Sequence, residues 1–185
     1  MRRPAVVCVL SLMVLAVGSS AWAQRPDTSG PQREAMKKLD SWVGEWEGTG
    51  WSMRGPGQRS EFTVHESVQP KLGGLVLLVQ GLGKGKDPAT GAETVGHDAL
   101  AVVSFDPKTS SYRFRHYTMQ GASGEAELTL TDKGMQWELQ GEGQTAFRMR
   151  FNIEIQGDTW HEYGEFSRDG QTWTRTMEMT LKRAQ

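Results

Sequence analysis

Hydrophobic and polar residues alternate along much of this chain, which is the pattern of β-strands with one buried face. The clearest case is residues 147–155, where Phe, Met, Phe, Ile and Ile occupy every second position and charged or amide side chains stand between them. Residues 135–140 and 173–182 show the same period of two. Because successive side chains of a strand point to opposite faces, these segments predict strands with an apolar inner face and a polar outer face.

Ten segments rich in Val, Phe, Tyr, Trp and Thr follow one another, with Gly, Asp-Pro or Asp-Gly between them. The predicted strands are residues 45–53, 61–69, 75–81, 99–105, 112–119, 125–130, 135–140, 146–155, 159–166 and 172–182. Ahead of them, Met36, Leu39 and Val43 recur at helical spacing and predict a short helix over residues 32–42. Consecutive antiparallel strands with local connections favour an all-β, up-and-down barrel of about ten strands over a sandwich, and such a barrel encloses a cavity.

Two connections carry more specific signals. Residues 83–96 are rich in glycine and charge, and we expect them to form a loop that covers or borders an opening of the barrel. Asp169-Gly170 predicts a tight hairpin between the last two strands, in which Gly170 has a positive φ.

The first 23 residues have the layout of an export signal: two arginines, an apolar run over residues 5–17, and small residues that end in Ala21-Trp22-Ala23. The apolar run is shorter than the roughly 20 residues of a membrane-spanning helix. We therefore expect a signal peptide over residues 1–23, a flexible segment over residues 24–35 and one β-barrel domain over residues 36–183. The mature protein would be periplasmic or extracellular, without membrane insertion.

Composition narrows the possible functions. The net charge is −1 and the single cysteine, Cys8, falls within the expected signal, so the mature domain would fold without disulfides. The basic residues are scattered singly, which argues against a nucleic-acid partner. Neither a Gly-x-Ser-x-Gly nucleophile motif nor a phosphate-binding loop occurs. The sequence leaves the oligomeric state open.

Six separated motifs carry a resemblance to a known family. They are LDSWVGEWEG at residues 39–48, PKLGGL at 70–75, HDAL at 97–100, FDP at 105–107, WHE at 160–162 and FSRDGQTW at 166–173. Together, over about residues 36–183, they resemble the DUF1579 family, whose members have no assigned function. The resemblance implies a calycin-like barrel, either lipocalin-like or nitrobindin-like, and calycins as a class bind small apolar or haem-like molecules.

The resemblance also implies a specific packing contact. In lipocalins the tryptophan of the Gly-x-Trp motif packs against a basic side chain from the last strand. Trp46 matches that tryptophan, and Arg175, Lys182 and Arg183 are the candidates for the basic side chain. The paired cysteines common in secreted lipocalins are missing, so the likeness is to the barrel rather than to those proteins.

None of the four histidines of the mature chain stands at metal-ligand spacing from another, so we expect no metal site. His116 shares a strand face with Tyr112 and Phe114, and it points into the cavity if this aromatic face is the inner one. A lone imidazole there suits axial ligation of haem, the one cofactor that the sequence suggests. A buried histidine bonded to a neighbour would look the same in sequence.

Glu162 shares the more apolar face of its strand with Trp160, which places a carboxylate inside the barrel. A buried carboxylate needs a partner, and Arg175 on the following strand is the expected one. Such a pair is either structural or orients the polar end of a ligand. His161 lies on the opposite face of the strand and cannot bond to Glu162.

The function hypothesis is an exported barrel that binds a small apolar or haem-like molecule. The residues expected to contact that molecule are Tyr112, Phe114, His116, Trp137, Phe151, Trp160, Glu162, Trp173 and Arg175. The alternative is an enzyme that uses Glu162 or His116 as an acid or base on an apolar substrate. The same bulky side chains would also suit a completely filled barrel without a cavity.

Overall fold

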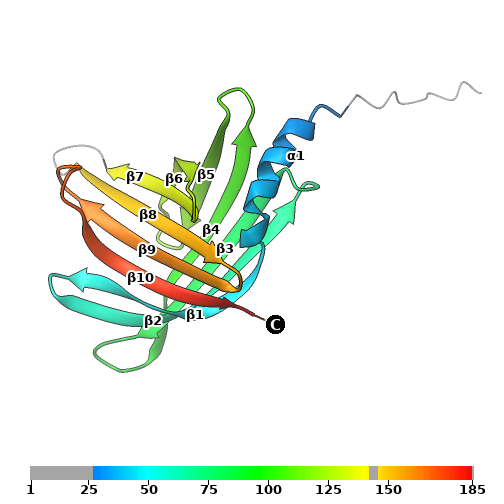
Figure 1. Cartoon of the computed structure of the whole chain (residues 1–185). Coiled ribbons are helices and arrows are strands. Elements are labelled where there is room, and N and C mark those ends of the chain that lie inside the picture. The colour runs from blue at the N-terminus through cyan, green and yellow to red at the C-terminus, as the bar shows by residue number, and fades with distance from the viewer. Residues whose placement is uncertain (1–26, 142–145, 185) are drawn as a thin grey trace, which may run out of the picture.

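The computed structural model describes residues 27–141 and 146–184. They form a short helical segment followed in the chain by one antiparallel sheet that closes into a barrel (Figure 1). Each strand pairs with its neighbours in the chain, and the first and last strands pair to close the barrel. The strands are β1 Gly44–Gly55, β2 Gln58–Lys71, β3 Val76–Lys86, β4 Glu93–Asp106, β5 Ser111–Thr118, β6 Ser123–Leu130, β7 Gly134–Gly141, β8 Phe147–Gln156, β9 Thr159–Ser167 and β10 Thr174–Arg183. The predicted all-β, up-and-down barrel is confirmed, while the expected signal peptide lies outside the described residues.

The helical segment covers one end of the barrel. It consists of α1, Gly30–Met36, and a 3₁₀ turn, Lys37–Trp42, so it begins two residues before the predicted start and takes in part of the segment expected to be flexible. Leu39 and Trp42 are almost fully buried against the barrel interior. The Tyr112 hydroxyl donates a hydrogen bond of 2.7 Å to the carbonyl oxygen of Ala35. No described helix is long and apolar enough to cross a membrane.

The residues predicted as a long glycine-rich loop are mostly strand. β3 continues to Lys86 and β4 begins at Glu93, so only residues 87–92 form the turn, which the Asp87 carboxylate holds by accepting the backbone N–H groups of Ala89 and Thr90. Gly83 serves close packing, because a Cβ there would lie 3.2 Å from the Cβ of His97, whereas Gly91 supplies the positive φ of the turn. Just before this segment, Gly81 lies directly opposite Glu66 of β2.

A β-bulge in β10 reverses which side chains point into the barrel on its N-terminal side. Arg175 pairs with Glu165 of β9 and Met177 pairs with Gly164, so Thr176 is an extra residue in the ladder. Residues before the bulge therefore lie on the opposite face from the one that simple alternation predicts. The connection from β9 to β10 spans residues 168–173 and is not a tight hairpin, although Gly170 has the predicted positive φ of 71°.

The closure of β1 on β10 explains the Gly-x-Trp motif. The Arg183 guanidinium lies over the Trp46 ring at 4.1 Å from its centroid and donates a hydrogen bond of 2.6 Å to the carbonyl oxygen of Val43. A Cβ at Gly44 would clash with this guanidinium, which is why the motif needs a glycine there. Of the three basic candidates, Arg183 is the one that packs on Trp46.

The helix-covered half of the barrel is filled. Trp160 makes edge-to-face contacts with Trp42 and Trp46, at centroid distances of 5.4 and 5.8 Å, and all three rings are almost fully buried. Val103 and Leu181 are likewise fully buried in this core. The other half is not filled by its own side chains, and it holds the candidate site.

Candidate functional site

A cavity of about 840 Å³ occupies the half of the barrel away from the helix. Its floor is the top of the filled core, where Trp42, Trp160 and Val79 are buried. Its rim carries the side chains of Arg54 and Glu61, which are exposed. The barrel is therefore filled at one end and hollow at the other.

Six of the nine residues expected to contact a ligand line this cavity. They come from β5, β7, β8 and β9 and are Phe114, His116, Trp137, Phe151, Trp160 and Glu162. Inner-face alternation placed them correctly because no bulge interrupts the pairing of these strands.

The other three expected residues lie elsewhere. Tyr112 faces inward, but it belongs to the filled end, beneath α1. Trp173 and Arg175 precede the bulge in β10 and lie outside the barrel, where the Arg150 guanidinium stacks on Trp173 at 4.0 Å. Arg175 bonds to Glu178 on the same outer face, so the expected pairing of Arg175 with Glu162 is wrong.

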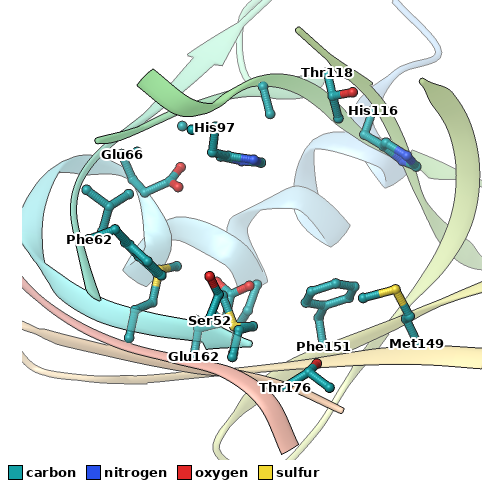
Figure 2. Close-up of a pocket in the computed structure, with 18 of the residues that line it drawn as sticks. Ser52, Phe62, Glu66, His97, His116, Thr118, Met149, Phe151, Glu162 and Thr176 are labelled. Carbon is teal, nitrogen blue, oxygen red and sulfur yellow. The ribbon is translucent and has the colours of Figure 1, made fainter. Parts of the chain in front are cut away.

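One side of the cavity is an aromatic wall made of Phe114, Trp137 and Phe151. The Trp137 ring stacks on Phe114 at 4.4 Å and 24° and on Phe151 at 4.3 Å and 13°. Met149 lies beside Phe151 at the mouth (Figure 2). Stacked rings and a thioether offer a weakly polar surface that suits a flat apolar molecule.

Two carboxyl groups project into the same space, Glu66 from β2 and Glu162 from β9 (Figure 2). Both side chains are buried, with 7% of their surface exposed. The Trp160 indole N–H donates a hydrogen bond of 3.1 Å to Glu162 Oε2. Gly81 makes room for Glu66, since a Cβ at position 81 would collide with the Glu66 carboxyl oxygens. We call Glu66 and Glu162 the carboxyl pair.

Burial changes the acidity of both groups. It raises the pKa of Glu66 to about 8, and the nearby charge of Glu162 adds to the effect. Burial also raises the pKa of Glu162 to about 7, although the hydrogen bond from Trp160 opposes that rise by stabilising the carboxylate. Because the two groups influence each other, they titrate as a pair that keeps at least part of its protons at neutral pH.

Two histidines face the same cavity, His97 and His116 (Figure 2). Partial desolvation lowers the pKa of His97, and the nearby charge of Asp98 opposes this, although the residue is exposed to solvent. Burial also lowers the pKa of His116, whose Nδ1 atom is buried without a hydrogen-bond partner among the described residues. Both imidazoles are therefore held neutral at neutral pH.

The sequence reasoning missed Glu66 and His97. Glu66 has the same strand parity as Phe62, Val64 and Val68, so it carried the signal that identified Glu162, a carboxylate within an apolar face. The predicted loop ends at residue 96 and the predicted strand begins at residue 99, so the sequence gives His97 a position between the two. His97 lies within β4 next to a register shift in the pairing with β3, which no local sequence pattern announces.

The carboxyl pair supplies most of the acid–base chemistry of the cavity. No group of three or more potential metal ligands occurs in the described ranges 27–141 and 146–184. The carboxyl pair can donate hydrogen bonds when protonated, accept them when ionised, or exchange a proton with a bound molecule.

Comparison with known proteins gives a family and a fold. Residues 30–183 match the family described as "Protein of unknown function (DUF1579)". No curated protein matches the sequence. The structure is similar to Rv2717c from M. tuberculosis, with a TM-score of 0.57 and 15% identity over 82% of this chain and 98% of that chain. It is also similar to the S-type phycobiliprotein lyase CPES from Guillardia theta, with a TM-score of 0.53 and 12% identity over 82% of this chain and 93% of that one.

Proposed function

Since the chain belongs to the DUF1579 family, for which no function is described, its role has to be inferred from its cavity, and we propose that it is an exported protein that binds a small, largely apolar molecule. The observation that carries the proposal is the hollow half of the barrel. A cavity of about 840 Å³ lies within the range of about 300–1,000 Å³ that small-molecule sites occupy. Part of its wall is aromatic, and two buried carboxyl groups project into it, a combination of apolar lining and placed polar groups that such sites use.

Two further observations support the proposal. The similarity of the barrel to a phycobiliprotein lyase and to Rv2717c is consistent with binding of a small molecule. Export is supported by the sequence of residues 1–23, which has the charged, apolar and small-residue regions of a signal peptide.

Titration with a neutral apolar dye such as N-phenyl-1-naphthylamine tests the binding function. We expect saturable binding of one dye per chain, with quenching of tryptophan fluorescence because Trp137 lies in the wall. Ala99→Phe adds a ring inside the cavity and should weaken binding by roughly tenfold or more. Val102→Phe adds the same ring on β4 but outside the cavity lining and serves as the matched control. Unsaturable binding, or equal binding by the two variants, would contradict the proposal.

Haem is one molecule that the cavity can be tested for directly. The neutral His116 imidazole fits the requirement for an iron ligand, and the exposed Arg54 at the rim can meet a carboxylate at the mouth. Haem bound in this way would give a Soret band that His116→Ala abolishes and His65→Ala, on the outer surface, leaves intact.

Catalysis is the second candidate function, and the carboxyl pair is the observation that favours it. A carboxyl group with a pKa near 7 is suited to general acid–base chemistry at neutral pH. An enzyme would release a changed molecule, and Glu162→Gln would stop turnover while leaving the dye bound. A binding protein would return its ligand unchanged, which mass spectrometry of the extracted ligand can establish.

A further inference from the structure

The interior and the exterior of the barrel differ in how their carboxylates are paired. Outside, Glu138 meets Arg148, Glu165 meets Arg150 at 2.8 Å, and Glu178 meets both Arg175 and His161. Inside, the carboxyl pair is buried, and the only lysine and arginine in the described cavity lining are Lys84 and Arg54. Lys84 bonds to Glu93, and Arg54 is exposed at the rim. Among the described residues, the interior thus has two buried carboxyl groups and no buried lysine or arginine. The two imidazoles that face it, His97 and His116, have a lowered pKa and stay neutral as the pH rises above 7.

Two neighbouring residues hold the carboxyl pair in a fixed position. Trp160 belongs to the buried floor, and its N–H fixes Glu162 Oε2 in one position. Gly81 leaves the space into which the Glu66 carboxyl extends. These two supports come from the filled half of the barrel and from a glycine in β3, so the carboxyl groups are positioned before any ligand arrives.

From this geometry we propose, on the basis of the binding function above, that the carboxyl pair receives a cationic nitrogen of the ligand while the apolar body of the ligand lies against the aromatic wall. A cation between two carboxylates removes their mutual repulsion and replaces the water that burial has taken away. The face of Phe151 that is not stacked on Trp137 also attracts cations. An anionic group at this depth would face two acids and no buried lysine or arginine among the described lining residues, so the ligand class is an aromatic or aliphatic amine or amidine.

The alternative is a neutral ligand whose carbonyl accepts hydrogen bonds from the protonated pair. The two cases have opposite pH dependence. A cation binds the ionised pair, so its binding releases protons and strengthens as the pH rises through the pKa values of about 7 and about 8. A neutral acceptor needs the protonated pair and binds more weakly over the same rise.

Two probes of the same shape separate these cases: 2-naphthylmethylamine, which is protonated, and 2-naphthalenemethanol, which is neutral. We expect the amine to bind the full-length mature protein roughly tenfold or more tightly than the alcohol at about pH 8. Calorimetry in two buffers of different ionisation enthalpy should show net proton release for the amine only. At about pH 6 the preference for the amine should shrink.

Glu66→Gln and Glu162→Gln should each reduce the preference for the amine several-fold, while the affinity for the alcohol stays unchanged and shows that the cavity is intact. Glu61→Gln removes an exposed rim carboxyl and should leave the preference in place. The inference is wrong if the wild-type protein binds the alcohol as tightly as the amine, or if the glutamine variants keep the preference. Failure of both probes to bind would instead overturn the binding function itself.

Discussion

Two carboxyl side chains link the stability of this barrel to pH. Glu66 and Glu162 are harder to ionise in the fold than in the unfolded chain, because burial raises the pKa of each. The folded protein therefore binds more protons than the unfolded chain between the unfolded pKa, about 4.5, and the folded values of about 7 and about 8. Because the folded state holds these extra protons, the free energy of unfolding falls as the pH rises through that interval.

This gives the first prediction. The free energy of unfolding of the ligand-free protein should decrease between about pH 5 and about pH 8, and Glu66→Gln should reduce the decrease by more than about 1.4 kcal/mol, the equivalent of one pKa unit. Urea unfolding at several pH values measures this. Glu61→Gln, at an exposed site of the same strand, should follow the wild-type profile. A wild-type stability that rises over this interval would show that the carboxyl pair is not buried as described.

At the scale of single residues, the sequence predicted the inner-face residues well wherever the alternation of apolar and polar positions was unbroken. Phe114, Trp137 and Phe151 were placed in the cavity from parity alone. The partner of Glu162 was not predictable, because it depends on contacts between strands that are far apart in the chain. The absence of a basic partner near Glu162 among the described residues became visible only in three dimensions.

At the scale of a strand, the bulge in β10 decides which side chains face the cavity. Simple alternation puts Trp173, Arg175 and Met179 on one face, whereas the extra residue Thr176 moves the first two outside. A bulge of this kind has no composition signal, since Thr suits a regular strand as well as a bulged one. This is why the end of β10 was predicted correctly and its beginning was not.

Thiol labelling tests the bulge. In the chain without Cys8, Arg175→Cys should react with a bulky maleimide roughly ten times faster or more than Met179→Cys, because only the first thiol is exposed. Circular dichroism of both variants provides the folding control. Similar labelling rates would indicate that residues 175 and 179 share a face and that β10 is regular.

The seam between β1 and β10 depends on Arg183. Its guanidinium stacks on Trp46 and bonds to the carbonyl oxygens of Val43 and Ser41, which ties the last strand to the end of the helical segment. Replacing it with methionine should lower the free energy of unfolding by about 1–3 kcal/mol, through loss of the cation–π contact and of hydrogen bonds made by a charged donor. Lys182→Met, on the neighbouring exposed position, should cost less than about 0.5 kcal/mol. Thermal unfolding measures the stability of both variants. Equal losses of stability would contradict the stabilising role of Arg183 between β1 and β10.

For the whole molecule, the division into a filled and a hollow half explains how the fold is stabilised and underlies the proposed binding function. The tryptophan cluster and the helical segment supply a core at one end, so the other end can remain open without disulfides. The ten-strand barrel and its short helix were predictable from periodicity and turn residues. Whether the barrel is hollow was not, because the same aromatic and methionine side chains fill one end and line a cavity at the other.

A crystal structure of the mature protein soaked with 2-naphthylmethylamine tests the central claim most directly. The account predicts one probe in the open half of the barrel, with its rings against Phe151 and the edge of Trp137 and its nitrogen within hydrogen-bond distance of Glu66 and Glu162. A barrel whose own side chains close the cavity, or a probe bound only on the outer surface, would contradict the account.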